Sequence, residues 1–278
     1  MSQPPSTVDA VLPPPIDAPL ASPVGVAVLP AGAPLAPPVG VAVLPGDARL
    51  APPVDVVLAP QAARGPIRAV VFDLDGVVVD SSAVMREAFS IAYAEVVGGG
   101  PAPFEEYNQH MGRYFPDIMR LMGLPLAMEE PFVRESYRMA HLVPLFPGVR
   151  ETLEELRARG IRTAIATGKS GPRARSLLDT LGVLGLFDRV IGSDEVARPK
   201  PAPDIVLQAL GHLDVPPAQA MMVGDAVIDL LSGREAGAAT AATTWHGGDV
   251  AALLAAGPDV VAHTPTDLLA HCPATLTP

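Results

Sequence analysis

One stretch of the chain decides the fold: Val70-Val-Phe-Asp-Leu-Asp-Gly-Val-Val-Val-Asp-Ser81. Its apolar beginning, Ala69-Val-Val-Phe72, predicts a buried strand that delivers Asp73 and Asp75 to its carboxyl end. Gly76 then permits a tight turn. Two carboxylates this close repel each other unless a cation or a protonation event separates their roles. A turn rich in polar caps is the alternative interpretation, and related motifs downstream weigh against it.

Five further apolar runs predict buried strands, namely Thr163–Ala166, Arg189–Ile191, Ala220–Val223, Thr240–Thr243 and Val260–Ala262. Segments with helical spacing lie between them, at residues 149–159, 171–181, 202–210, 227–236 and 249–255. Strands that alternate with helices predict a parallel sheet with helices on both faces. The fold class is therefore α/β, with a Rossmann-like parallel sheet as its core.

About 70 residues separate the first strand from the helix that begins at Val149, too many for a simple strand-to-helix connection. Four helical patterns fill this interval, at residues 83–97, 104–111, 115–122 and 128–141. They predict a helical cap domain, residues 82–145, inserted into an α/β core of residues 67–81 and 146–278. Both tethers should emerge near the carboxyl end of the first strand, where open α/β sheets bind ligands.

The segment before the core, residues 1–66, holds 16 of the 33 prolines and repeats itself with a period of 15 residues. Proline at this density blocks helices and central strands, which predicts an extended, disordered segment. A binding arm is the alternative. The segment is also consistent with translated upstream sequence added to a domain that begins near Arg68.

Composition excludes several classes of protein. A net charge of −11 argues against a nucleic-acid partner. Cys272 is the single cysteine, which excludes a disulfide framework and a cysteine-based zinc site. No basic residue precedes Arg49, as a secretory signal would require, and proline interrupts each apolar run well short of the roughly 20 residues needed to cross a bilayer. We expect a soluble, cytoplasmic protein without a membrane partner.

Lysine is rare in this chain, since only Lys169 and Lys200 are lysines among 19 basic residues. Such a bias suggests a genome that encodes arginine wherever a generic cation suffices. Arginine's broad fork cannot replace a compact ammonium at every site. Both lysines are therefore candidates for chemistry.

Three downstream motifs place polar groups at strand ends. In Ala164-Ile-Ala-Thr-Gly-Lys-Ser170, the Thr167 hydroxyl and the amides of Gly168 and Lys169 are suited to phosphate oxygens; helix capping by Thr167 or Ser170 is the alternative. Arg198-Pro-Lys-Pro-Ala-Pro-Asp204 presents Lys200 on a proline-stiffened loop. In Met222-Val-Gly-Asp-Ala-Val-Ile-Asp-Leu230, Asp225 ends a strand and Asp229 lies one helical turn later, so both face one edge.

These motifs, in this order, resemble the haloacid dehalogenase superfamily, and specifically its phosphatases with a helical cap after the first strand. The resemblance covers Arg68 to about Cys272 and implies a role for each matching residue: Asp73 as nucleophile, Asp75 as general acid and base, Thr167 and Lys200 as phosphate ligands, Asp225 and Asp229 as the acidic pair around magnesium, and Lys169 as a supporting residue. A phosphate monoester is dianionic, so a carboxylate nucleophile needs Mg²⁺ and an ammonium to offset the repulsion. Oxygen ligands from Asp73, the Asp75 carbonyl and Asp225 suit that ion. Attack by Asp73 would give an aspartyl-phosphate.

Other chemistries of the same superfamily fit less well. A dehalogenase has no use for a proton donor at Asp75, and a phosphonate hydrolase needs a cap lysine, which residues 82–145 do not contain. Sugar phosphomutases place a histidine twelve residues after the nucleophile, where this chain has Met85. The sequence thus favours a phosphatase for a small phosphate monoester, with a mutase second and a non-catalytic binding protein of this fold as a third hypothesis.

The cap is expected to choose the substrate. Arg113 is the candidate for contact with a substrate carboxylate or hydroxyl, with a surface ion pair to Glu105 or Glu106 as its alternative. Trp245 is expected to line the sheet edge or, more simply, to pack in the core. The cap and its surroundings, in the stretches Ala83–Phe89, Gly112–Asp117 and Ala166–Ser176, look like the phosphatase-like proteins of 3-amino-5-hydroxybenzoate gene clusters in ansamycin producers and, less closely, like phosphoglycolate phosphatases. The first resemblance implies a sugar or aminosugar phosphate in antibiotic precursor supply.

Overall fold

A computed structural model describes residues 65–274 of the 278-residue chain. All of them belong to one compact unit, Asp55–Pro278. The sequence predicts that the proline-rich segment, residues 1–66, is disordered. All of this segment except residues 65 and 66 lies outside the described part of the chain. Within residues 65–274, no helix is both long and apolar enough to cross a membrane.

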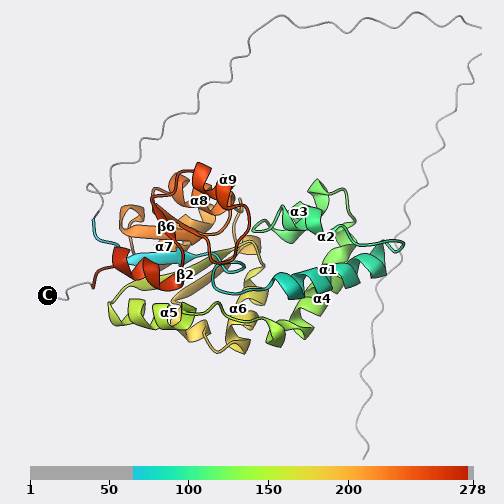
Figure 1. Ribbon diagram of the computed structural model, residues 1–278, viewed down its shortest axis with the longest axis horizontal. Helices are drawn as coiled ribbons and strands as arrows, with labels where there is room; N and C mark the ends of the chain where they lie inside the picture. Colours follow the sequence, from blue (N-terminus) through green and yellow to red (C-terminus); the bar gives the residue numbers. More distant parts are fainter. Residues whose placement is uncertain (1–64, 275–278) are drawn as a thin grey trace, which may run out of the picture. The chain divides into compact units, whose positions relative to one another are not determined.

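Six parallel strands form one sheet in the order β3-β2-β1-β4-β5-β6 (Figure 1). Their bounds are Ala69–Phe72 (β1), Arg162–Thr167 (β2), Arg189–Gly192 (β3), Ala220–Gly224 (β4), Ala239–Thr243 (β5) and Val260–Ala262 (β6). β1 lies at the centre, with Phe72 in register with Ile165 of β2 and Val223 of β4. The order places the ends of β1, β2 and β4 beside one another, and it confirms the predicted α/β fold class.

Helices cover both faces of the sheet (Figure 1). Their bounds are Val149–Ala158 (α5), Gly171–Thr180 (α6), Asp204–Leu213 (α7), Val227–Glu235 (α8) and Val250–Ala255 (α9). Side chains of β1 alternate between two apolar clusters: Val70 and Phe72 share one with Leu153 of α5, whereas Val71 shares the other with Ile205 of α7. A strand that is buried on both faces in this way reads as a continuous apolar run, which is why its position was predictable.

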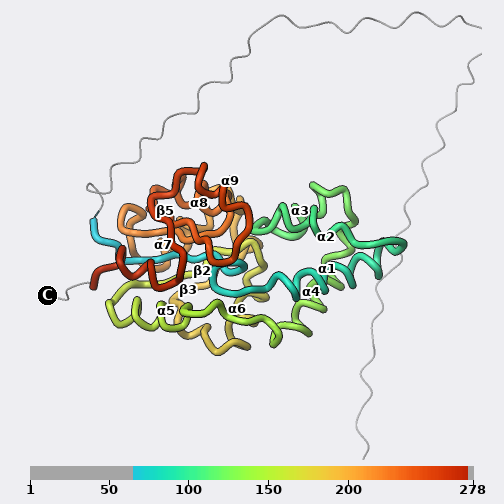
Figure 2. The backbone as a smooth tube through the Cα atoms, viewed as in Figure 1, coloured from blue at the N-terminus to red at the C-terminus, as the bar shows by residue number. Residues whose placement is uncertain are grey.

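Residues between β1 and α5 form a helical insertion at one end of the sheet, with α1 and α4 side by side (Figure 2). The bounds are Ser82–Val96 (α1), Phe104–Asn108 (α2), Phe115–Leu121 (α3) and Glu129–Arg138 (α4). Aromatic rings form its centre, with 4.5 Å between the centroids of Phe89 and Tyr107 and 4.1 Å between those of Phe115 and Phe132. Rings stacked this closely add to the stabilisation that burial provides.

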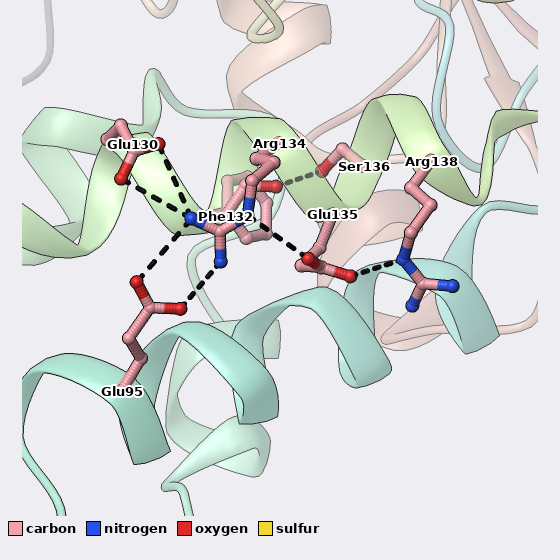
Figure 3. A network of polar contacts seen from close by, with 7 residues as sticks. All are labelled: Glu95, Glu130, Phe132, Arg134, Glu135, Ser136 and Arg138. Carbon is pink, nitrogen blue, oxygen red and sulfur yellow. Dashed lines mark hydrogen bonds and ion pairs between the residues drawn. The ribbon is translucent and has the colours of Figure 1, made fainter.

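An arginine network fastens α4 to α1 on the surface of the insertion (Figure 3). Arg134 of α4 lies 2.6 Å from Glu95 of α1 and also contacts Glu130 and Glu135, and Arg138 lies 2.6 Å from Glu135. Since both arginine side chains are well exposed, water screens these pairs, and their contribution to stability is small. The aromatic cluster therefore holds the insertion together, and the arginines refine the contact between its two longest helices.

The two tethers of the insertion lie against each other, as the sequence predicted. The Asp80 amide donates to the Pro144 carbonyl at 3.0 Å, and the Phe146 amide donates to the Val78 carbonyl at 3.1 Å. Val79 and Leu145 form an isolated antiparallel bridge. The insertion is thus attached through a short two-stranded neck just beyond the carboxyl end of β1.

Helix ends differ most from the predicted pattern, whereas the strand ends differ by at most one residue. α2 ends at Asn108 instead of Met111, and Gly112 follows with φ +86°. α7 begins at Asp204 and not at Ala202, because Pro201 and Pro203 cannot donate the backbone hydrogen bonds that a helix interior needs. Short 3₁₀ turns complete the connections, at Leu126–Met128 (η2), Ala140–Leu142 (η3), Leu184–Leu186 (η4), Ser193–Glu195 (η5), Pro217–Gln219 (η6) and Pro265–His271 (η7).

Candidate active site

Asp73 and Lys200 form the centre of the site. Asp73 follows β1 directly, is 1% exposed, and donates its amide to the Val223 carbonyl of β4 at 2.9 Å. The Lys200 ammonium donates to Asp73 Oδ1 at 2.8 Å, to Asp229 Oδ1 at 2.6 Å and to the Ala166 carbonyl at 3.1 Å. All three donor positions of the ammonium are therefore used, and the lysine joins groups that follow or belong to β1, β2 and α8.

Burial sets the protonation behaviour of this centre. Burial raises the pKa of Asp73 to about 7, although the positive charge of Lys200 acts to lower it. The negative charges of Asp229 and Asp75 raise this pKa further. Burial alone would lower the pKa of Lys200, but the charges of Asp229 and Asp73 outweigh it and hold the pKa above its ordinary value. The pKa of Asp225 is also raised, by burial and then by the charges of Asp229 and Asp73. Three carboxylates thus share a single ammonium.

A cation fits this cluster. Asp73, Asp225 and Asp229 each offer a carboxylate oxygen, and these oxygens lie within 4.8 Å of one another. Asp229 already accepts from Lys200 through Oδ1 and from the Ala226 amide through Oδ2 at 3.1 Å. The Asp73 and Asp225 carboxylates remain as the better ligands, and hard oxygen ligands of this kind are those that Mg²⁺ prefers.

Gly76 allows the loop after β1 to approach this cluster. It has φ +83°, a conformation that side chains other than glycine rarely adopt, and a Cβ atom there would overlap with Asp225 Oδ2. The glycine in the Asp-Leu-Asp-Gly sequence therefore serves both the predicted turn and the seating of the Asp225 carboxylate.

Asp75 belongs to a second, separate group of charges. Its Oδ2 lies 3.2 Å from the Lys169 ammonium, and its Oδ1 accepts a hydrogen bond of 2.5 Å from Ser81 Oγ. Burial raises the pKa of Asp75, but Lys169, the Ser81 hydroxyl and Arg173 together outweigh it, and the pKa lies below its ordinary value. Of the two aspartates in the first motif, one therefore faces Lys200 and the other faces Lys169.

Thr167 and Gly168 form the third edge of the site, at the end of β2. Thr167 is 1% exposed, and its Oγ1 accepts from the Lys169 amide at 3.2 Å. That amide was expected to face a phosphate and is instead used within the turn. Ser170 occupies the N-cap position of α6, but its side chain makes no capping hydrogen bond.

The insertion meets the core at Gly168. A Cβ atom at Gly168 would overlap with the Gly112 carbonyl oxygen of the insertion. A cleft of about 460 Å³ opens beside this seam, lined among others by Asp75, Arg113, Asp225 and His246. The carboxylates that follow β1 and β4 and the Gly112 turn of the insertion therefore border one space.

Arg113 borders this cleft, as expected of a residue that contacts substrate. The alternative was a surface ion pair with Glu105 or Glu106, but Glu105 pairs with Arg86 at 2.8 Å. Arg120 pairs with Asp117 at 2.6 Å on the exposed surface. Trp245 packs against the apolar core and donates from Nε1 to the Val77 carbonyl at 3.1 Å. The core interpretation of the tryptophan is therefore confirmed.

Two neighbours of Asp75 were not singled out from the sequence. Ser81 was quoted only as the end of the first motif, and Arg173 lies only within the stretch Ala166–Ser176 that carries part of the resemblance. Arg173 is 7% exposed and lines a small cavity together with Asp75 and Lys169. No sequence signal separates Arg173 from the other arginines of an arginine-rich chain.

Comparisons with known proteins agree with this geometry. The haloacid dehalogenase-like hydrolase family matches residues 67–237. The chain is 34% identical over 208 residues to a probable phosphatase, IndB, of Dickeya dadantii, which covers 70% of this chain and 89% of the relative. It is 29% identical over 213 residues to a phosphoglycolate phosphatase of Aquifex aeolicus, with 73% and 95% covered.

A solved structure of similar fold contains a sugar bisphosphate. A variant of CbbY from Rhodobacter sphaeroides, in complex with xylulose-(1,5)bisphosphate, superposes with a TM-score of 0.64 at 26% identity, covering 74% of this chain and 99% of that one. The expected enzyme class is confirmed, since the family is one of hydrolases and both curated relatives are named as phosphatases. On the match over residues 67–237, the chain belongs to the haloacid dehalogenase-like hydrolases.

Proposed function

We propose that this hydrolase cleaves small phosphate monoesters through a phosphoryl group carried on Asp73, with Mg²⁺ as its cofactor. One observation carries the proposal: the Asp73 carboxylate and the Lys200 ammonium are 2.8 Å apart in a buried acidic cluster, while Asp75, two residues later, belongs to a separate charge pair. A nucleophile and a proton-transfer group need such different surroundings in order to perform different tasks.

Each residue of the site then has a task. Asp73 attacks phosphorus while the bond from phosphorus to the leaving oxygen breaks, and Asp75 gives its proton to that oxygen. Asp75 then takes a proton from the water that attacks the phosphoryl group, which releases Asp73 and inorganic phosphate. Because Asp75 is held ionised by Lys169, it must take up its proton as the phosphate dianion arrives beside it.

The remaining groups hold the phosphate and the metal. The Thr167 hydroxyl, the Gly168 amide and Lys200 are the proposed ligands of the phosphate oxygens, and Lys200 would exchange its hydrogen bond to Asp73 for one to a phosphate oxygen. Asp73, Asp225 and the Asp75 carbonyl would hold Mg²⁺, which supplies positive charge against the negative charge that collects on the transferring phosphoryl group. Asp229 fixes the ammonium of Lys200, and Lys169 sets the charge of Asp75, so both act as supporting residues.

We assign substrate choice to the insertion. Residues 82–145 act as a cap on a core of residues 67–81 and 146–278, and Arg113 contacts the leaving group from the cap side of the cleft. The resemblance to the phosphatase-like proteins of 3-amino-5-hydroxybenzoate gene clusters suggests a sugar or aminosugar phosphate in antibiotic precursor supply. The Aquifex aeolicus relative supports phosphoglycolate as the second candidate substrate.

A phosphomutase is the weaker alternative because of Met85. In the position where mutases of this superfamily have a histidine, the Met85 sulfur lies 3.8 Å from the Lys169 ammonium, and the side chain is 6% exposed. A thioether cannot carry or relay a proton as an imidazole does. A non-catalytic binding protein is disfavoured because every proposed catalytic position holds a group that can do the chemistry.

Hydrolysis of para-nitrophenyl phosphate tests the proposal. We expect turnover with Mg²⁺, loss of turnover in excess EDTA and recovery when Mg²⁺ is returned. A screen of phosphorylated sugars, aminosugars and 2-phosphoglycolate would then rank the substrates. Absence of hydrolysis for every ester in the presence of Mg²⁺ would leave the binding protein as the better hypothesis.

A further inference from the structure

Arg173 is a buried cation that forms no ion pair with a carboxylate among residues 65–274. It lies on α6 of the core and reaches α4 of the insertion, where Nη2 donates to Ser136 Oγ at 3.0 Å. Its guanidinium carbon is 4.9 Å from the centre of the Phe132 ring. Its Nε is buried and has no hydrogen-bond partner among residues 65–274. Among the described residues, one serine hydroxyl and one aromatic face contact the guanidinium directly, and the charge of Asp75 favours its charged form without an ion pair between them.

The arginines on the neighbouring helix have a different arrangement. Arg134 and Arg138 of α4 are exposed, yet both lie close to glutamates (Figure 3). Water would solvate these two arginines even without a carboxylate, whereas Arg173 is shielded from water. A buried charge that lacks a partner is costly, and it persists where something outside the chain offsets the cost.

The space around Arg173 adjoins the proposed site of chemistry. Two cavities of about 20 Å³ each share Arg173, Lys169 and Met85 in their walls, and Asp75 lines the first of them. A volume of this size holds about one water molecule, so only the anionic end of a leaving group that extends from the large cleft would reach Arg173. Asp75 and Arg113 line both the first cavity and the large cleft, so a leaving group beside Asp75 can extend toward Arg173.

Charge is distributed unevenly between the two ends of the site. The cluster of Asp73, Asp225 and Asp229 is acidic, whereas Lys169 and Arg173 form a cationic end in which Asp75 pairs with Lys169. Burial lowers the pKa of Lys169 and of Arg173, and for Lys169 the charge of Arg173 adds to the lowering. An additional anion at this end would be stabilised by both cations.

We propose that Arg173 forms a binding subsite for a second anionic group, a carboxylate or a phosphate, on the leaving group of the substrate. The inference rests on the proposed phosphatase function and narrows its substrate class. Leaving groups with a carboxylate or a second phosphate are favoured, whereas an aminosugar whose ammonium faced Arg173 would be repelled. The terminal guanidinium nitrogens, and not the fully buried Nε, supply the donors that such anions accept.

Matched pairs of esters test the subsite. One pair, 2-phosphoglycolate and 2-hydroxyethyl phosphate, differs by a carboxylate; the other, fructose 1,6-bisphosphate and fructose 6-phosphate, differs by a phosphate. The full-length protein should prefer the anionic member of at least one pair in kcat/KM. Arg173→Met should reduce that preference by about 10- to 100-fold, the loss expected when a hydrogen bond to a charged group is removed. The pair that responds identifies the anion.

Two controls separate binding from structure. Ser136→Ala removes the contact of Arg173 with the insertion but leaves the charge, so the preference should stay within about threefold of the unsubstituted protein. Arg173→Met replaces a buried, unpaired charge with an apolar side chain, so its melting temperature should be equal or higher. A fall of more than about 5 °C, with equal losses for both members of each pair, would make Arg173 a structural clamp and overturn the subsite.

The two proposals fail in different ways. A protein that hydrolyses para-nitrophenyl phosphate but shows no preference within either pair refutes the subsite alone. Retention of the preference in Arg173→Met does the same. A protein that hydrolyses no ester refutes the phosphatase proposal itself.

Discussion

The edge of the sheet and the helical insertion use charged residues in opposite ways. At the edge, Lys200 is fully buried, and its ammonium contacts Asp73 and Asp229, which are also buried. In the insertion, Arg134 is exposed and bridges glutamates on the surface, while aromatic rings fill the interior (Figure 3). At the edge of the sheet, buried charged residues form the site. In the insertion, the charged pairs of α1 and α4 lie on the surface of a packed apolar cluster.

This difference separates the chemistry from the selection of the substrate. Parallel strands bring Asp73, Thr167 and Asp225 together, because the ends of β1, β2 and β4 are neighbours in the sheet. No strand fixes the position of Arg113 or Arg173 relative to the substrate; helix packing and the contact between insertion and core do so. Substitutions of the same kind should therefore have unequal effects in the two regions.

Removal of one carboxylate in each region should give the largest contrast. Asp73→Asn should lower turnover by at least about 10³-fold, because an amide cannot act as the attacking carboxylate. Asp117→Asn removes an exposed carboxylate from the insertion and should leave turnover within about twofold. Steady-state hydrolysis of para-nitrophenyl phosphate measures both variants, and circular dichroism checks that each is folded. Activity of Asp73→Asn within tenfold of the unsubstituted protein would contradict the assigned nucleophile.

Exchange of one cation in each region should give the next largest contrast. Lys200→Arg keeps the charge, but the larger fork cannot occupy a fully buried position where one ammonium contacts three acceptors. We expect kcat/KM to fall by about 10²-fold or more, which corresponds to about 2.7 kcal/mol of transition-state stabilisation. Arg134→Lys, on the exposed surface of α4, should change kcat/KM by less than twofold. Near-normal kinetics for Lys200→Arg would reduce its role to charge alone.

The sheet edge was largely predictable from the sequence. Each strand is a short apolar run that ends at a polar residue, so the run gives both the position of the strand and the identity of the groups at its end. Asp73, Thr167 and Asp225 were placed in this way, and Lys200 was found because lysine is rare in the chain. The structure brings these four residues to the same edge.

The contacts of the insertion were predictable only in part. Helical spacing predicted all four helices. The position of the insertion after the first strand predicted that its two tethers lie close together. It could not predict that Arg173 of α6 would be buried against Phe132 and Ser136, since this depends on how two separately predicted units pack. The separate pairing of Asp75 with Lys169 was also missed, because the sequence does not show which side chains beyond the ends of β1 and β2 face each other.

A substitution at the seam between the two regions should have an intermediate effect. In Gly168→Ala, the new methyl group would overlap with the Gly112 carbonyl and keep the insertion from seating on the core, although the Gly168 amide remains. We expect kcat/KM to fall about tenfold or more, as happens when reacting groups are misplaced by a fraction of an ångström. Gly185→Ala is the matched control, because a Cβ atom there meets nothing within 4 Å. Equal kinetics for the two variants would mean that the seam is not closed during turnover.

A change in the aromatic cluster should affect stability and have the smallest effect on chemistry. Phe89→Leu removes the ring that stacks on Tyr107 and should destabilise the protein by about 1–2 kcal/mol. The melting temperature should then fall by about 3–6 °C, while hydrolysis of para-nitrophenyl phosphate changes by less than about threefold. Leu121→Ala, at a position that is 59% exposed, is the control and should shift the melting temperature by less than about 1 °C. A large loss of turnover in Phe89→Leu would show that the insertion takes part in the chemistry itself.

Detection of the covalent intermediate tests the central claim most directly. In Asp75→Asn the nucleophile remains, but the group that activates water is lost, so an aryl phosphate with a good leaving group should phosphorylate Asp73 faster than water releases it. With Mg²⁺ present, we predict a burst of about one para-nitrophenolate per active site. Mass spectrometry should find one phosphoryl group on the peptide that contains Asp73, and none in the Asp73→Asn, Asp75→Asn double variant. Continued slow turnover without a burst, or a phosphoryl group on any other residue, would contradict the account.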